Sequence, residues 1–187
     1  MIFIFEPSGY TCGLWELFHI MSIGVSERYD QIDKSSTTDL DVSPSSAARI
    51  LRNVVSNFFG CIGNMTLLNC WQSPFCSILV ALVCRDHFVQ NYDQCGKDVC
   101  HRLTTELQTK EAAMQLSIWL WETHNDVNKR LISEAAHRNG RQAFAVEEKA
   151  SQWPTETMCI TCWGLDGSFD DRMVYLFLKK SYWYGVS

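Results

Sequence analysis

The sequence contains no block of lysine and arginine residues. Its 187 residues include 16 Lys and Arg against 21 Asp and Glu, so the formal net charge is -5 and the pI is near 5.5. Domains that bind nucleic acid are usually basic, because contacts to phosphates supply much of their affinity. The charge therefore argues against nucleic acid as a partner.

The sequence also lacks long period-two alternation and internal repeats, which argues against a β-sandwich and against a repeat array. Apolar residues recur instead at helical spacing, and the hydrophobic fraction is 47% with seven tryptophans. That content argues against disorder, and the length suits one domain with a core. We predict an all-α fold, a four-helix bundle plus a short fifth helix.

Membrane and export signals are weak. The N-terminus "MIFIFEPSGY" has no basic region and only a short apolar run, so no signal peptide is predicted in this chain. The apolar stretch 65–83 approaches membrane-spanning length. However, Asn69, Gln72 and Pro74 interrupt it, and this argues against a spanning helix.

Cysteine, in contrast, is abundant. There are nine cysteines, so at least one is unpaired or is paired with another chain. The only intact Cys-x-x-Cys is Cys159-Ile-Thr-Cys162. Such use of cysteine favours an oxidising compartment or thiol chemistry. The others are Cys12, Cys61, Cys70, Cys76, Cys84, Cys95 and Cys100.

Helical periodicity predicts the first two helices. Gly24 weakens or ends the first helix, and a polar loop over 26–43 follows. The core stripe of this helix is Leu14, Leu17, Phe18 and Met21. The second begins at the cap Ser43 with Pro44 in its first turn. Its inward residues are predicted to be Ala47, Ile50, Leu51, Val54, Val55 and Phe58.

Three further helices are predicted. A short one runs from Cys84 to about Tyr92, and a longer one from about Lys110 to Leu131. The longer helix carries an inward stripe of Leu116, Leu120, Val127 and Leu131. A polar connection over 134–152 follows, and the last helix runs from the Asp170-Asp171 cap to Tyr182.

The helix over 110–131 has a second stripe on another face: Trp121, His124, Asn125 and Asn128, at i, i+3, i+4 and i+7. Indole, imidazole and amide groups together suit a planar heteroaromatic ligand, with rings to stack on and amides to reach its polar atoms. The same stripe also fits a half-buried tryptophan at a bundle edge beside solvated histidine and asparagine.

Two other helices repeat this pattern, with Trp15, His19 and Ser22 on the first and Cys84, His87 and Asn91 on the third. Each histidine taken alone fits a structural role, but three together favour a binding site. A cysteine at a helix N-terminus faces the positive end of the helix dipole, which favours the thiolate. We expect this of Cys84.

These segments resemble the Erv/ALR flavin-linked sulfhydryl oxidase domain, and most of all its version in quiescin sulfhydryl oxidases. The matching blocks occur in the family's order. They are "CGLWELFH" (12–19), "FFGC" (58–61) with "CRDHF" (84–88), "WLWETHNDVNKRL" (119–131) and "QWPTETMCITC" (152–162).

The resemblance implies a helical bundle that holds FAD and converts two thiols and O2 into a disulfide and H2O2. It implies that the redox pair is Cys61 and Cys84, with Cys84 next to the flavin, and that Cys159 and Cys162 form a structural disulfide. A basic contact expected just before Trp153 is displaced to Lys149. The implied FAD contacts are Trp15, His19, His87, Trp121, His124, Asn125, Val127, Asn128, Lys149 and Trp153.

The redox motif is split. Cys61 and Cys84 are 23 residues apart, 20 more than in a Cys-x-x-Cys, so we predict an insertion over about 62–83, for instance a retained intron. The longer loop adds only about 2 kcal/mol of closure entropy. We predict a sulfhydryl oxidase domain over 10–185 and an N-terminal remnant over 1–9 of a truncated product. The alternative is a catalytically impaired flavin-binding remnant.

The resemblance also implies the substrates, the partners and the cellular location of the domain. Its substrates would be protein or small-molecule thiols and O2, with a thioredoxin-like domain or protein as a candidate electron donor, and a homodimer is compatible with it. The implied location is the secretory pathway. A competing interpretation is a zinc module, although its spacing is irregular and it leaves the Trp/His/Asn stripes unexplained. Its ligands would be Cys95, Cys100, His101, Cys159 and Cys162.

Overall fold

The computed structural model describes residues 10–29, 43–60, 76–103 and 109–183. The described residues are mostly helical and contain no strand, and the all-α prediction is confirmed. The α-helices are α1 (Tyr10–Tyr29), α2 (Pro44–Gly60), α3 (Cys76–Asp93), α4 (Val99–Arg102), α5 (Lys110–Arg138), α6 (Ala145–Ala150) and α7 (Asp171–Tyr182), and the 3-10 turns are η2 (Gly96–Asp98) and η3 (Ile160–Cys162).

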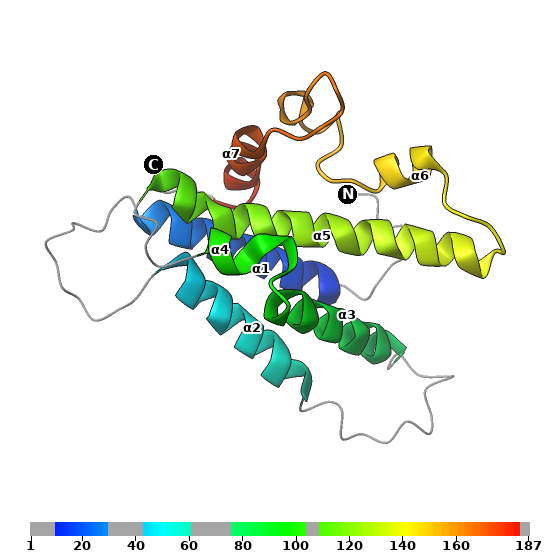
Figure 1. Cartoon of the computed structure of the whole chain (residues 1–187), viewed down its shortest axis with the longest axis horizontal. Helices are drawn as coiled ribbons and strands as arrows, with labels where there is room; N and C mark the ends of the chain where they lie inside the picture. Colours follow the sequence, from blue (N-terminus) through cyan, green and yellow to red (C-terminus); the bar gives the residue numbers. More distant parts are fainter. Residues whose placement is uncertain (1–9, 30–42, 61–75, 104–108, 184–187) are drawn as a thin grey trace, which may run out of the picture.

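Helix α5 is the central element and runs across the described part of the molecule in Figure 1. The Thr109 side chain caps it by accepting a hydrogen bond from the Ala112 N–H at 3.2 Å. Helix α1 lies along α5, and both α2 and α7 contact these two helices. Helix α3 packs against α2. As a result, α5 is buried along more than one face.

Two apolar clusters fill the space around α5. The first lies between α1, α2, α3 and α5 and includes Phe18, Leu51, Val55, Phe88, Leu116, Trp119 and Leu120. The second lies between α1, α5, α7 and the segment before α7, and includes Ile23, Ile118, Trp121, Trp153, Cys162, Val174 and Leu178. Trp119 and Trp121, two residues apart on α5, belong to different clusters.

Helix α1 differs from its prediction. It continues through Gly24 to Tyr29, and a Cβ at Gly24 would lie 3.2 Å from the Trp183 ring. Leu17 and Met21 are exposed, so placing them in the core was wrong. The buried face carries Phe18, His19, Ser22, Ile23 and Ser26 instead, because α1 packs against α2, α5 and α7 together.

Helix α2 begins as predicted, with Ser43 Oγ accepting from the Ser46 N–H at 3.2 Å. Leu51 and Val55 are buried as expected, but Ile50 and Val54 are exposed. The buried stripe is therefore narrower than the sequence pattern. Phe58 is in α2, but its side chain lies outside the described residues, as does that of Leu14 in α1.

Helices α3 and α5 are both longer than predicted. Helix α3 begins at Cys76, so Cys84 is not at its N-terminus, and the dipole argument for a Cys84 thiolate is wrong. Helix α5 continues to Arg138, and the connection over 134–152 contains α6. Leu131 is exposed there, against expectation. Helix α7 starts as predicted, with Asp170 accepting from the Met173 N–H at 3.0 Å.

Candidate functional site

Four residues of the predicted site, Trp15, His19, His124 and Trp153, come together with Tyr182 in one ring cluster. Trp15 and His124 stack with ring centroids 4.3 Å apart and planes within 3°. His19 stacks on Tyr182 at 5.1 Å. The Trp153 ring lies 5.6 Å from that of His19 and 5.9 Å from that of His124. Helices α1, α5 and α7 thus meet at this cluster.

The second stripe of α5 explains how Trp153 is positioned. Its carbonyl oxygen accepts from Trp121 Nε1 at 2.6 Å and from Asn125 Nδ2 at 2.8 Å. Its N–H donates to Asn125 Oδ1 at 2.8 Å. Trp121 and Asn125 therefore fix the backbone of a segment 28 or more residues away in sequence. The interpretation of this face as a solvated bundle edge is wrong, because Trp121 and His124 are buried.

The two buried histidines are held neutral. Burial, and secondarily the proximity of His124, lowers the pKa of His19 to about 3, and burial lowers the pKa of His124 to about 4. The His19 Nε2 and His124 Nδ1 atoms lie 3.4 Å apart, at the long end of a hydrogen bond. Near neutral pH, each ring therefore carries one donor and one acceptor nitrogen.

The cluster also carries unsatisfied polar atoms. Among the described residues, His19 Nδ1 and Trp153 Nε1 are buried and have no hydrogen-bond partner. Buried polar atoms are nearly always paired in folded proteins, since an orphan costs about 1–3 kcal/mol. Two such nitrogens on rings of one cluster mark a place where a ligand with polar atoms would be accommodated.

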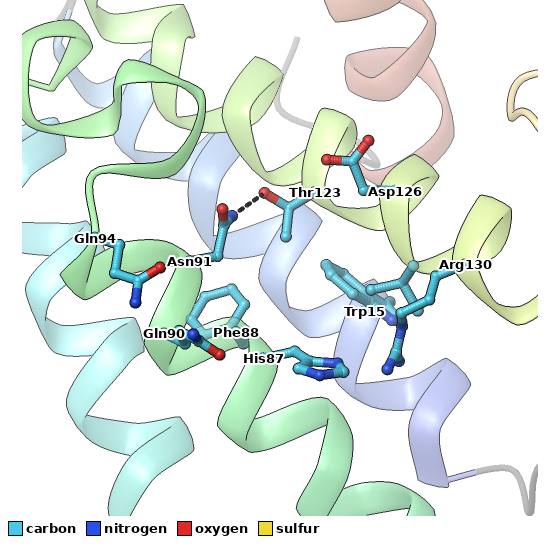
Figure 2. Close-up of a pocket in the computed structure, with 10 residues that line it drawn as sticks. Trp15, His87, Phe88, Gln90, Asn91, Gln94, Thr123, Asp126 and Arg130 are labelled. Carbon is cyan, nitrogen blue, oxygen red and sulfur yellow. Dashed lines mark hydrogen bonds between the residues drawn. The ribbon is translucent and has the colours of Figure 1, made fainter.

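A pocket of about 300 Å³ lies beside the cluster, between α1, α3 and α5. Three predicted contacts line it: Trp15, His87 and Val127. Figure 2 shows Trp15 and His87 at the pocket. Its wall is mixed in character, with Phe88 and amide, hydroxyl and charged side chains. Trp15 joins the pocket to the ring cluster, since it takes part in both. This volume is at the lower end of ligand-binding pockets.

The remaining predicted contacts lie elsewhere or are partly exposed. Asn128 is partly buried on α5. Lys149 Nζ pairs with Glu156 Oε1 at 2.7 Å and lies 5.4 Å from the centroid of the Trp163 ring. Cys61 lies outside the described residues, and the side chain of Cys84 is also outside them, although its backbone is part of α3.

Two disulfides are present among the described residues, Cys159–Cys162 and Cys95–Cys100. Cys162 is buried in the second apolar cluster. The four sulfurs are bonded in pairs, so in this form they supply no thiolates to the zinc module that the sequence left as an alternative. No group of three or more metal-ligating side chains occurs in the described part of the chain.

Some residues at the site were not predicted. Tyr182 and Phe177 contact the rings of His19 and Trp153 from α7. Asn91 and Thr123 line the pocket, with Asn91 Nδ2 3.4 Å from Thr123 Oγ1. Of these two, Asn91 belongs to the predicted stripe of the third helix, and Thr123 was not predicted. The contacts of α7 have no signal in its sequence, because they depend on how it packs against α1.

Curated proteins similar to this chain carry one kind of name. "Sulfhydryl oxidase 2" of Homo sapiens is 28% identical over 181 residues, and the match covers 95% of this chain and 20% of that protein. "Sulfhydryl oxidase 2" of Mus musculus is 27% identical with the same coverage. "Sulfhydryl oxidase 1" of Oryza sativa subsp. japonica is 27% identical, covering 95% of this chain and 26% of that protein.

The chain thus spans about a fifth to a quarter of the length of these relatives. No family model matches the chain, and no solved structure matches it. Within the described ranges, no helix has the length and apolar character needed to cross a membrane. Over nearly its whole length, this chain is similar to curated proteins named sulfhydryl oxidases, as its motifs predicted.

Proposed function

We propose that this chain is an FAD-dependent thiol oxidase domain, which forms disulfides from thiols and reduces O2 to H2O2. The observation that carries this proposal is the ring cluster of Trp15, His19, His124 and Trp153, with its two unpaired buried nitrogens. The similarity to sulfhydryl oxidases supports the thiol chemistry. The proposed domain covers 10–185.

The residues fit a flavin in their chemistry. The fused rings of a flavin carry nitrogen and oxygen atoms at their edge, which match unpaired ring nitrogens such as His19 Nδ1 and Trp153 Nε1. Trp15, His87 and Val127 would bind it from the pocket. When bound, the flavin supplies the two-electron chemistry between thiol and O2.

The other proposed contacts have supporting roles. His124 would remain neutral against the cofactor, because burial lowers its pKa to about 4. Trp121 and Asn125 would hold the Trp153 backbone in place through their hydrogen bonds. Asn128 and Lys149 are proposed as outer contacts on the basis of the family resemblance.

For the thiol step, we assign Cys61 and Cys84 as the exchanging pair. Position 84 lies three residues before His87 on α3, so the two positions share one helix face, and His87 lines the pocket. Substrate thiolate would attack the Cys61 sulfur and release Cys84 as the thiolate nearer the pocket. A second substrate thiol would then resolve the mixed disulfide. The proposed insertion over 62–83 includes the first eight residues of α3, which are continuous with Cys84 in one helix.

The proposed substrates are protein or small-molecule thiols, with O2 as the electron acceptor and a thioredoxin-like protein or domain as a candidate donor. We place the protein in the secretory pathway, since disulfides persist in oxidising compartments. A homodimer is part of the same proposal.

The decisive experiment is the absorbance spectrum of the purified protein with and without dithiothreitol. We expect a bound-flavin spectrum that bleaches with excess dithiothreitol under argon and recovers in air, while H2O2 accumulates. Cys84→Ser should retain the flavin but lose turnover. A colourless protein that does not take up added FAD contradicts the proposal, and turnover by Cys84→Ser at the parent rate contradicts the assigned thiol.

Paired histidine variants test the site itself. His124→Ala should weaken FAD binding by at least tenfold, because the stacked and buried His124 ring is removed. His137→Ala is the matched control, since His137 is exposed near the end of the same helix. Equal FAD affinity in the two variants, measured by flavin fluorescence, would place the cofactor elsewhere.

A further inference from the structure

A second disulfide, Cys95–Cys100, links the turn after α3 to α4, outside the ring cluster described above. It closes a small loop in which the two cysteines are five residues apart. Both cysteines are exposed, so a thiol in solution can reach the bond. Neither the stripes on α1, α3 and α5 nor the proposed flavin chemistry uses this pair.

The loop backbone is strained. Cys95, Lys97 and Asp98 have φ angles of 57°, 51° and 59°, and they are the only non-glycine residues with positive φ in the described part of the chain. This left-handed conformation is unfavourable for residues that carry a Cβ. Three such residues within four positions make the closed loop a local high-energy arrangement, which opening the disulfide would release.

The same loop is attached to the pocket wall. A Cβ on Gly96 would collide with the Asn91 side chain, and Trp119 Nε1 donates to the Gly96 carbonyl oxygen at 3.0 Å. Lys97 Nζ pairs with Asp126 Oδ2 at 2.9 Å. Asn91 and Asp126 both line the pocket, so the conformation of the loop is linked to two of its walls.

The disulfide Cys159–Cys162 provides the contrast. Cys162 is fully buried, and its carbonyl oxygen accepts from the Asp170 N–H at 2.9 Å. No non-glycine residue with positive φ occurs in the turn that contains this bond. Cys162 lies in the second apolar cluster and Cys159 is partly buried against it, so this bond is less accessible to an attacking thiolate than Cys95–Cys100, whose two cysteines are exposed.

We propose that Cys95–Cys100 is a thiol-exchange site, which protein or small-molecule dithiols reduce and whose strained loop favours that reduction. A donor thiolate attacks one sulfur, forms a mixed disulfide and releases the other cysteine as a thiolate. The second thiol of the donor then displaces the first cysteine. The donor leaves oxidised to a disulfide, and the loop keeps two electrons and two protons as two thiols. The inference does not depend on a bound flavin.

The first test is peptide-resolved alkylation of the folded protein during exposure to limiting dithiothreitol. We expect Cys95 and Cys100 to become alkylated at least tenfold faster than Cys159 and Cys162, while the circular dichroism spectrum stays unchanged. Equal rates for the two pairs would overturn the proposal. So would a Cys95–Cys100 bond that opens only in denaturant.

The second test separates strain from exposure with two variants at one exposed position. Lys97→Gly and Lys97→Ala both remove the ion pair with Asp126, but only glycine relieves the positive φ at 97. In glutathione buffers, the equilibrium constant for reducing Cys95–Cys100 should be roughly threefold to tenfold lower in Lys97→Gly than in Lys97→Ala. Equal constants would show that the backbone strain does not favour reduction and would overturn the proposal.

Discussion

Helix α5 holds a disulfide-bonded segment on each of two sides, and in both cases an indole N–H binds a backbone carbonyl. Trp119 binds the carbonyl of Gly96 in the Cys95–Cys100 loop, and Trp121 binds that of Trp153, ahead of Cys159–Cys162. The surroundings of these two indole hydrogen bonds differ. One side of α5 carries an exposed, strained loop and the other a buried ring cluster.

The difference indicates that a disulfide's surroundings, more than the bond itself, decide its role. The entropy of closing loops this short is about 2 kcal/mol for either pair, so it does not separate them. Burial protects Cys162 and makes it part of the core. Because Cys95 and Cys100 are exposed and their loop has positive φ angles, dithiols should reduce the Cys95–Cys100 disulfide first.

The largest predicted effect is a pH dependence that arises on the buried side. His19 and His124 have pKa values lowered to about 3 and about 4, from an ordinary value of 6.5. Below pH 6.5 the unfolded chain therefore binds more protons, so this stability is complete above that pH and is lost as the pH falls towards 4. Urea unfolding should show a loss of up to about 4 kcal/mol between pH 7 and pH 5.

The matched control for this pH effect is His124→Asn, which removes one of the two titrating groups. Its unfolding free energy should depend on pH less steeply between pH 7 and pH 5. A slope equal to that of the parent would show that His124 is not held neutral by the fold. This pH window lies above the range in which carboxylates titrate. At Glu27, for example, burial acts to raise the pKa, but the hydrogen bonds to Lys179 and Tyr175 and the Lys179 charge lower it overall.

Removing each disulfide should have unequal effects on stability. The double substitution of Cys159 and Cys162 by serine should cost about 3 kcal/mol, because it loses a cross-link and buries a hydroxyl in an apolar cluster. The same change at Cys95 and Cys100 should cost about 1 kcal/mol, because relief of the strained backbone offsets part of the lost cross-link. Thermal unfolding of both variants measures this, and equal losses would remove the distinction between the two sides.

The two indole bonds allow a finer comparison. Trp119→Phe and Trp121→Phe should each lower the free energy of unfolding by about 1–2 kcal/mol, since each loses a hydrogen bond and leaves a small void. Only Trp119→Phe should accelerate reduction of Cys95–Cys100, measured by alkylation. If Trp121→Phe accelerates it equally, the two sides of α5 are coupled rather than independent.

The smallest expected effect is that of the ion pair between Lys97 and Asp126. Asp126→Asn should change the free energy of unfolding by less than about 0.5 kcal/mol, since both side chains are partly exposed. Chemical unfolding at low and high salt checks this. A loss above 1 kcal/mol would mean that the ion pair, and not the Trp119 bond, holds the loop to the pocket wall.

The sequence predicted where most of the helices lie along the chain, but not their lengths or which of their faces are buried. The caps at Ser43 and Asp170 are local, and both occur where expected. Gly24 does not end α1, and the Trp183 ring lies where a Cβ at position 24 would crowd it, a contact that the local sequence does not reveal. Ile50 and Val54 belong to the apolar pattern of α2 but are exposed, since the described neighbours of α2 cover only part of its circumference.

The candidate site shows the same division. The i+3 and i+4 spacing of His124 and Asn125 from Trp121 placed them on one face and predicted a role in binding. It did not predict that Asn125 binds the Trp153 backbone or that His124 stacks on Trp15, since these contacts join helices far apart in the sequence. The exposed Cys95–Cys100 pairing was not predicted either, because spacing alone does not select partners among nine cysteines.

By itself, the sequence determined the helical class, the cap positions at Ser43 and Asp170 and the residue blocks that resemble sulfhydryl oxidases, because helical periodicity, capping and motif spacing are local properties. Only the tertiary structure decided which faces of α1 and α5 are buried, that two ring nitrogens have no partner among the described residues, and that Cys162 is buried while Cys95 and Cys100 are exposed. These properties depend on neighbours distant in sequence, which only packing brings together.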